Sequence, residues 1–470
     1  MKPFDAIDAA VEEEKTISLY AASKKIQPRA VNGQYSRLRW AAVFLTQLVF
    51  YGLPWLEWGQ RQAVLFDLGA RRFYLFGLVL YPQDFIYLTG LLVIAALSLF
   101  LFTAVAGRLW CGYACPQTVY TEIFMWIEKK IEGDRQARLR LDDAPMSFNK
   151  FGKKSAKYTV WILVALWTGF TFVGYFTSIR SLAPDILGGG LSQWGTFWIL
   201  FYSFATLGFA GYMREQVCKY MCPYARFQSA MFDHDTLVVT YDVARGEPRG
   251  VRSKKSPDAD KKLGDCIDCN LCVHVCPTGI DIRKGLQYEC IGCGACADVC
   301  DTVMTKQKLP LGLVRYTTQR ALDTKLSKAE TIRRVFRPRI LVYGSVLMAL
   351  TIALFTSLAM RIPLRVDVVR DRASLARMVE GGQLENVFRL QIMNATEVTQ
   401  EYRISASGLE GLKMASDEVV TVGPAESRWV PVRLRIPNGA SSGSHPIQFE
   451  ISDAQGKAKV SEKAAFLVPR

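Results

Sequence analysis

Eight of the twelve cysteines lie between positions 266 and 300, where they form two copies of one spacing, C-x2-C-x2-C-x3-C. In proteins that bind two 4Fe–4S clusters through this spacing, three thiolates of one run bind one cluster and the fourth binds the other. The crossed pattern predicts one cluster on Cys266, Cys269, Cys272 and Cys300, and a second on Cys290, Cys293, Cys296 and Cys276. The alternatives are zinc sites or disulfides, but zinc sites usually show two Cys-x-x-Cys pairs with a longer spacer. One-electron chemistry is therefore the first conclusion.

Half of the residues are apolar, and five apolar stretches are long enough to cross a bilayer, which takes about 20 residues. These stretches cover 38–56, 85–106, 158–177, 194–213 and 340–360. A shorter apolar run at 73–81 ends at Pro82. Because this run is too short to span, we expect it to lie at the membrane interface.

The distribution of Lys and Arg predicts the topology, because basic residues near membrane ends favour the cytoplasm. Ten of them lie in 107–157, against three in 58–83 and one in 179–193. We therefore expect a cytoplasmic N-terminus, a cytoplasmic segment around the two cysteine runs, and a C-terminal region on the outer side. The first 36 residues are polar, so no cleavable signal peptide is expected. The basic residues that set the topology account for most of the net charge of +15, so no nucleic-acid partner is needed to explain it.

From about residue 385, short runs of alternating hydrophobicity are separated by Gly, Pro, Asn and Ser. This pattern predicts an immunoglobulin-like β-sandwich. The expected fold is thus a transmembrane helical bundle with a two-cluster ferredoxin-like α+β domain and a C-terminal sandwich. The expected parts are an N-terminal segment 1–37, a four-span region 38–230, the ferredoxin-like domain 231–338, a fifth span 339–360 and the outer domain 361–470.

The other four cysteines form a second repeat, Cys-x3-Cys-Pro, at Cys111 and Cys115 and again at Cys218 and Cys222. Each pair follows an apolar span that ends on the cytoplasmic side in the predicted topology. Proline disfavours helix at the residue before it, so a helix should end or restart at the second cysteine of each pair. The pairs could converge into one site of up to four sulfurs, and thiolates select Cu(I), zinc or iron–sulfur clusters. Inert buried thiols and a dithiol that cycles through a disulfide are the alternatives.

Histidines are scarce, and their positions exclude one common membrane cofactor. The chain has three, His234, His274 and His445, and none lies in an expected span. No pair can therefore hold a transmembrane haem. No G-x-G-x-x-G run follows an expected strand, so no flavin or nicotinamide fold is recognisable. Electrons must come from a partner protein or from quinol.

The whole chain resembles the cytochrome c oxidase accessory proteins of the FixG-like family. The resemblance rests on Pro-Trp-Leu-Glu-Trp at 54–58, Arg-Gln-Ala-Val-Leu-Phe-Asp at 61–67, both Cys-x3-Cys-Pro motifs, the doubled cysteine run and the C-terminal β domain. Membrane quinol-dehydrogenase subunits share the spans and the cysteine motifs. They generally lack the outer β domain, which favours the FixG-like family.

The resemblance implies a bacterial inner-membrane protein that reduces Cu(II) to Cu(I) for assembly of a cbb-type oxidase. By that analogy, the catalytic copper or electron-transfer thiols would be Cys111, Cys115, Cys218 and Cys222. The implied partners are oxidase subunits or copper-delivery proteins, together with an electron donor that no motif identifies. Whether the chain forms homo-oligomers is left open. Two other functions compete with this one: a redox-inactive assembly scaffold, and a quinol-oxidising ferredoxin that passes electrons to a partner.

Overall fold

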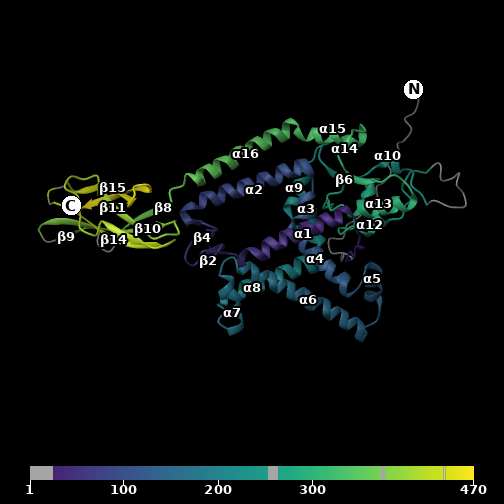
Figure 1. Cartoon of the computed structure of the whole chain (residues 1–470), viewed down its shortest axis with the longest axis horizontal. Helices are drawn as coiled ribbons and strands as arrows, with labels where there is room; N and C mark the ends of the chain where they lie inside the picture. The colour runs from purple at the N-terminus through teal and green to yellow at the C-terminus, as the bar shows by residue number, and fades with distance from the viewer. Residues whose placement is uncertain are drawn as a thin grey trace, which may run out of the picture.

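The computed structural model describes residues 25–251, 263–371, 376–379, 381–437, 439 and 441–469. The molecule is elongated: long helices occupy its middle, a β-sandwich lies at one end and the cysteine-rich segment (residues 263–307) lies at the other (Figure 1). Of the expected N-terminal segment 1–37, residues 1–24 lie outside the described residues.

Four helices in the described part of the chain are long and apolar enough to cross a membrane. They are α2 (Phe85–Ala106, which follows the short turn η2, Pro82–Asp84), α6 (Phe148–Val173), α8 (Gln193–Thr206, continued by the π-helix η3, Leu207–Met213) and α16 (Pro338–Ala359). α2 and α16 run side by side, almost none of their residues is fully buried, and many of their apolar side chains are exposed. Lipid is the environment that such a surface requires, because apolar patches of this size are unfavourable in water.

The helix at the first expected span, α1 (Gln34–Gly52), is not among those four, although it is 19 residues long. Arg37, Arg39 and Gln47 make it less apolar than the others. It nevertheless runs from the cysteine-rich end toward the opposite end of the bundle (Figure 1), and it contacts α3, α6 and α13. The structure differs from the expectation because part of α1 faces protein, where polar side chains find partners.

At the sandwich end, the chain forms small antiparallel sheets between α1 and α2. β1 (Glu57–Trp58) pairs with β2 (Arg61–Gln62), and β3 (Val64–Asp67), β4 (Arg72–Leu75) and β5 (Leu78–Leu80) form a second sheet. The run at 73–81, expected at the membrane interface, therefore lies mostly in strands. Tyr74, Val79 and Tyr81 of this run pack against the sandwich, in a buried cluster with Met393, Ala395 and Ala425, while Leu75 and Phe76 are exposed.

The C-terminal domain is a two-sheet sandwich, as the alternating pattern predicts. One sheet has the order β12 (Lys413–Met414), β14 (Ser427–Ile436), β10 (Gln383–Asn394) and β8 (Leu364–Arg370), with β9 (Arg377–Val379) also paired to β10. The other has the order β13 (Val419–Val422), β11 (Gln400–Ser407), β15 (Gly443–Asp453) and β16 (Lys459–Val468). Fully buried Phe388 and Phe449 meet edge to face between the sheets, with ring centroids 5.2 Å apart.

The opposite end carries all twelve cysteines on short elements. After α2 come α3 (Leu109–Tyr113), α4 (Pro116–Ile131) and α5 (Arg135–Asp143). Outside this end of the molecule, α7 (Ile179–Gly188) follows α6 and precedes α8 along the chain. After η3 come η4 (Val217–Met221), α9 (Pro223–Met231), β6 (Val238–Tyr241) and α10 (Val243–Gly246). The cysteine-rich segment adds α12 (Leu271–His274), η5 (Ile282–Lys284) and α13 (Ala295–Gln307), and β7 (Val314–Thr317), α14 (Gln319–Asp323), α15 (Lys328–Arg333) and η6 (Arg334–Phe336) lead to α16.

Candidate redox site

The two expected cluster sites coincide with two separate cavities of the cysteine-rich segment. One cavity is lined by Cys266, Cys269, Cys272 and Cys300, together with apolar side chains and Arg283. The other is lined by Cys276, Cys290, Cys293 and Cys296, and also by Cys272. The structure therefore brings together each set of four thiols that the crossed spacing predicts, including the two that come from the other run.

The backbone around the second cavity needs glycine. Gly292 and Gly294 have φ of 65° and 74°, a region that side chains with a Cβ rarely adopt. A Cβ on Gly294 would also stand 2.8 Å from the side chain of Tyr35. These two glycines let the chain bend closely around the cavity.

The chemistry of the donor set fits two 4Fe–4S clusters. Burial raises the pKa of Cys272 to about 11 and the pKa values of Cys290 and Cys300 to about 12. Burial also raises the pKa of Cys293 and Cys296. Thiol ligands bind metals as thiolates, so iron must displace these protons and compensate the buried charge. Among the described residues, no three Cys, His, Asp or Glu side chains converge on the position of a single metal ion. Each cavity is lined by the four cysteines that would each ligate one iron of a 4Fe–4S cluster.

The two Cys-x3-Cys-Pro motifs share one feature: a short helix, α-helical in the first motif and a π-helix in the second, breaks at the second cysteine before a new helix begins. Cys111 lies in α3, and Cys115 is the residue before the first turn of α4. Cys218 lies in η4, and Cys222 is the residue before the first turn of α9. In both motifs proline occupies the first helical position, where its missing N–H costs nothing. The predicted break at the second cysteine is thus observed twice.

The two motifs meet each other and the second cluster cavity. Cys111 and Cys218 both pack against the buried apolar cluster that contains Cys293. Burial raises the pKa of Cys218, and the charges of Cys115, Cys111 and Cys222 add to this effect, to about 12 in total, so these three thiols lie within electrostatic range of Cys218. Burial also raises the pKa of Cys111, to about 11, while the Gln228 amide donates a hydrogen bond of 2.9 Å to its sulfur and opposes the shift.

Gly112 allows the first motif to touch the loop of the second cavity. A Cβ on Gly112 would stand 2.8 Å from the carbonyl oxygen of Gly292, 2.9 Å from that of Ile291 and 3.0 Å from the Cα of Cys293. Only glycine fits here without a shift of the backbone.

Arg108 joins three parts of the site. Its guanidinium donates to the carbonyl oxygens of Tyr288 and Cys290 (2.9 Å to the latter) in the loop that leads into the second cavity. It also donates to the carbonyl oxygen of Ala225 in α9, at 3.3 Å. Arg108 is only 6% exposed, so the planar guanidinium holds these segments together from inside the protein.

Sequence reasoning missed Arg108, Gly112 and Gln228. Arg108 lies just after an apolar span, where a basic residue is expected for topology alone. The sequence therefore does not indicate that Arg108 also binds the loop of the second cavity. Gly112 lies inside a motif that was interpreted through its cysteines alone. Gln228 lies six residues after Cys222 with no pattern linking it to Cys111, 117 positions earlier in the chain.

Fold and site together define a membrane-bound protein of the two-cluster ferredoxin type that carries an immunoglobulin-like domain. Three family models match the chain: a 4Fe–4S dicluster domain at residues 213–319, a 4Fe–4S binding domain at residues 88–133, and the Ig-like fold at the C-terminus of FixG at residues 354–469. The second match contains the first Cys-x3-Cys-Pro motif, and the first match contains the other motif and the doubled run.

Proteins from two bacteria are similar over most of their length. Protein RdxB of Cereibacter sphaeroides is 40% identical over 422 residues, covering 87% of this chain and 88% of the relative. The nitrogen fixation protein FixG of Rhizobium meliloti is 38% identical over 445 residues, which cover 88% of this chain and 84% of FixG. Protein RdxA of C. sphaeroides is 36% identical over 475 residues, which cover 95% of this chain and 98% of RdxA. The chain belongs to the FixG/RdxA/RdxB family of multi-pass membrane iron–sulfur proteins.

A solved structure also matches part of the chain. The crystal structure of a FixG-related protein from Vibrio parahaemolyticus is 27% identical and covers 22% of this chain and 95% of its own, with a TM-score of 0.21.

Proposed function

We propose that this protein is a membrane-bound oxidoreductase that reduces Cu(II) to Cu(I) for the assembly of a cbb-type cytochrome c oxidase. The observation that supports it most directly is the packing of Cys111 and Cys218 against the same buried cluster as Cys293. Soft thiols next to a predicted 4Fe–4S ligand combine a preference for Cu(I) with a nearby source of electrons.

In this proposal Cys111, Cys115, Cys218 and Cys222 bind the copper substrate. Cu(II) prefers N and O ligands, whereas thiolates select Cu(I), so these ligands favour the reduced ion. Each copper takes up one electron, and the two bound clusters would supply one electron each.

The proposed ligands of the first cluster are Cys266, Cys269, Cys272 and Cys300, and those of the second are Cys276, Cys290, Cys293 and Cys296. Arg108 and Gly112 keep the copper thiols in contact with the second set. We further propose a bacterial inner-membrane topology with residues 1–37 and 231–338 in the cytoplasm, spans within 38–230 and 339–360, and residues 361–470 in the periplasm. The partners would be oxidase subunits or copper-delivery proteins.

The test compares wild-type protein with the double variant Cys111→Ser/Cys218→Ser. Both are purified without oxygen, reduced with dithionite and freed of excess reductant, and Cu(II) is then added with a chelator that reports Cu(I). We expect at least a tenfold slower formation of Cu(I) in the variant. Met348→Leu is the matched control, because it removes a sulfur from the lipid-facing side of α16, where Met348 is 61% exposed.

Iron content and cluster absorbance show whether the variant keeps its clusters. A variant with intact clusters that forms Cu(I) at the wild-type rate would overturn the role of the thiols. The scaffold alternative predicts something else as well: the oxidase would still assemble in cells that carry the double variant.

A further inference from the structure

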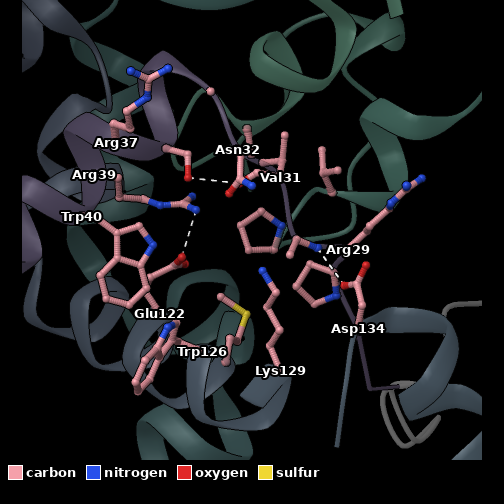
Figure 2. A pocket seen from close by; sticks show the side chains of 18 of the residues that line it. Arg29, Val31, Asn32, Arg37, Arg39, Trp40, Glu122, Trp126, Lys129 and Asp134 are labelled. Atoms are coloured by element: carbon pink, nitrogen blue, oxygen red, sulfur yellow. Dashed lines mark hydrogen bonds and ion pairs between the residues drawn. The ribbon is translucent and has the colours of Figure 1, made fainter. Parts of the chain in front are cut away.

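A cavity of about 520 Å³ lies between the start of α1, the helix α4 and the cysteine-rich segment. Figure 2 shows Trp40 and Trp126 along one side of this cavity, with Lys129 and Asp134 on another. Its size falls within the usual range for small-molecule sites, about 300–1,000 Å³. Neither the cluster sites nor the copper thiols line it.

The cavity contains a buried pair of opposite charges. The Arg39 guanidinium lies 3.0 Å from the Glu122 carboxylate, and the two side chains are only 9% and 12% exposed. Figure 2 shows them pointing toward each other beside Trp40. The Nε of Arg39 is buried without a hydrogen-bond partner. A ligand with both a donor and an acceptor oxygen could bind this pair.

A second cavity of about 740 Å³ continues the first one along the bundle, between α1, α4 and α6. The two share five lining residues, Asn32, Trp40, Phe44, Trp126 and Lys129. Beyond these the second cavity is lined mainly by apolar and aromatic side chains, among them Val43, Leu163 and Trp167. Leu163 is 59% exposed in a helix that is long and apolar enough to span a membrane. The combined space therefore has a polar inner end and an apolar end open to lipid.

The polar end also adjoins the second predicted cluster. Val275 and Pro277, which flank the proposed ligand Cys276, line this cavity, and so does Ala295, which precedes the ligand Cys296. A ring bound in the cavity is separated from that cluster by little more than these residues. This is the arrangement needed for an electron donor from the membrane.

We propose that the joined cavities bind an isoprenoid quinol, with its hydroquinone ring at Arg39 and Glu122 and its tail in the apolar part. The inference rests on the proposed function, because it names the electron donor for the same clusters. Oxidation of one quinol to quinone breaks two O–H bonds and releases two protons and two electrons. The two clusters, when bound by their cysteines, would accept one electron each. The protons leave one at a time, each bonding to the Glu122 carboxylate before it passes to water at the cavity mouth.

The charges favour a quinol over the headgroup of an anionic phospholipid. The buried pair carries no net charge, and the Glu122 carboxylate would repel a phosphate. Of the other basic residues that line the cavity, Arg138 is buried but already pairs with Glu128 at 2.9 Å, and Arg29, Arg37 and Lys129 are exposed.

The test measures equilibrium binding of radiolabelled decylubiquinone to the full chain in phosphatidylcholine nanodiscs. Leu163→Trp fills the apolar part from its exposed side, and Trp126→Leu removes an aromatic wall that both cavities share. We expect each to weaken binding at least tenfold. Trp194→Leu is the matched control, since Trp194 is 73% exposed on α8 and lines neither cavity, and it should bind as wild type does.

Glu122→Gln separates binding from proton transfer. It should bind quinone within about threefold of wild type, but its clusters should be reduced by decylubiquinol at least tenfold more slowly. Wild-type affinity in Leu163→Trp would overturn the proposal. So would displacement of the quinone by low concentrations of phosphatidylglycerol, because the cavity would then be a lipid site.

Dithionite bypasses the quinol, which keeps the two proposals distinguishable. Leu163→Trp reduced with dithionite should still form Cu(I) at the wild-type rate. If quinone binds as expected but dithionite-reduced wild type forms no Cu(I), the copper proposal fails and the quinol site stands.

Discussion

Gly112 packs so closely on Gly292 that a methyl group at position 112 would stand 2.8 Å from the Gly292 carbonyl oxygen. One residue belongs to a Cys-x3-Cys-Pro motif beside the membrane, and the other belongs to the loop that carries three ligands of the second predicted cluster. A contact between backbones cannot adjust by rotation of a side chain. The relative position of the copper thiols and the second cluster is therefore built into the fold.

Gly112→Ala tests this contact. The added methyl group must push the loop of Gly292 away, and overpacking of this kind costs about 1–3 kcal/mol. We expect a lower melting temperature in detergent and an altered EPR spectrum of the second cluster. Gly152→Ala is the matched control: this glycine lies in helix α6, and a methyl group there would meet no neighbouring side chain or other element within 4 Å. Alanine there should leave the spectrum unchanged and stabilise the helix by up to about 1 kcal/mol. If both substitutions changed the melting temperature and the EPR spectrum equally, the close contact at Gly112 would not be what positions the second cluster.

Arg108→Lys should make the second cluster lose its iron more readily. Lysine keeps the charge but lacks the planar fork that reaches the carbonyl oxygens of Cys290 and Ala225 together. We predict that a ferrous chelator removes iron from the reduced variant several times faster than from wild type. Arg140→Lys, an exposed position on α5, should release iron at the wild-type rate. Unchanged iron release in Arg108→Lys would contradict the clamping role of Arg108.

Glu128 should stabilise the bundle in a pH-dependent way. Burial alone would raise the pKa of Glu128, but ion pairs with Arg214 (2.7 Å) and Lys25 (2.9 Å) outweigh burial and lower the pKa to about 2. Because the folded-state pKa is below the ordinary value of 4.5, this stabilisation is present above pH 4.5 and is lost as the pH falls toward 2.

Glu128→Gln removes the partner of buried Arg138 and Arg214, which costs about 3–5 kcal/mol. Unfolding measured between pH 7 and pH 3 should show a large deficit at neutral pH that shrinks as the pH falls. Glu410→Gln, at an exposed position, should follow the wild-type curve. A deficit that stays constant down to pH 3 would mean that steric effects of the substitution dominate.

Asp84 should hold the C-terminal domain against the membrane helices. Its carboxylate is fully buried and pairs with Arg361, in the junction between α16 and β8, at 2.5 Å and with Arg365, in β8, at 3.0 Å. In Asp84→Asn we expect trypsin to cleave at Arg361 several times faster than in wild type, because the junction is released. Asp185→Asn, exposed on α7, serves as control and should be cleaved at the wild-type rate. Resistance of Asp84→Asn to trypsin would show that apolar packing alone holds the domain.

The sequence predicted the parts of the site whose ligands follow a fixed spacing. Crossed ligation by Cys276 and Cys300 is predicted by the doubled run, because in proteins with this spacing the fourth cysteine of each run ligates the other cluster. The sandwich is readable for a similar reason, since alternation with period two reflects one buried and one exposed face.

The rest depends on contacts between distant segments, which leave no local pattern. The Arg39–Glu122 pair joins α1 and α4 across 83 positions, and a polar residue near a helix end is common without such a partner. The same pair explains why α1 is less apolar than the other long helices. The β-strands at 72–75 and 78–80 were missed because their apolar face is covered by residues of the C-terminal domain more than 300 positions away.

The central claim is that electrons pass from the clusters to copper held by the membrane-proximal thiols. The most direct measurement is an anaerobic stopped-flow experiment on protein whose two clusters have been reduced and freed of reductant. Cu(II) is added, and cluster reoxidation and Cu(I) formation are followed together in the same mixing experiment. We predict one Cu(I) per oxidised cluster, equal rate constants for both signals, and a slowing of both by at least tenfold in Cys111→Ser/Cys218→Ser. Equal rates in wild type and variant would mean that the clusters reduce free copper without these thiols, which would contradict the account.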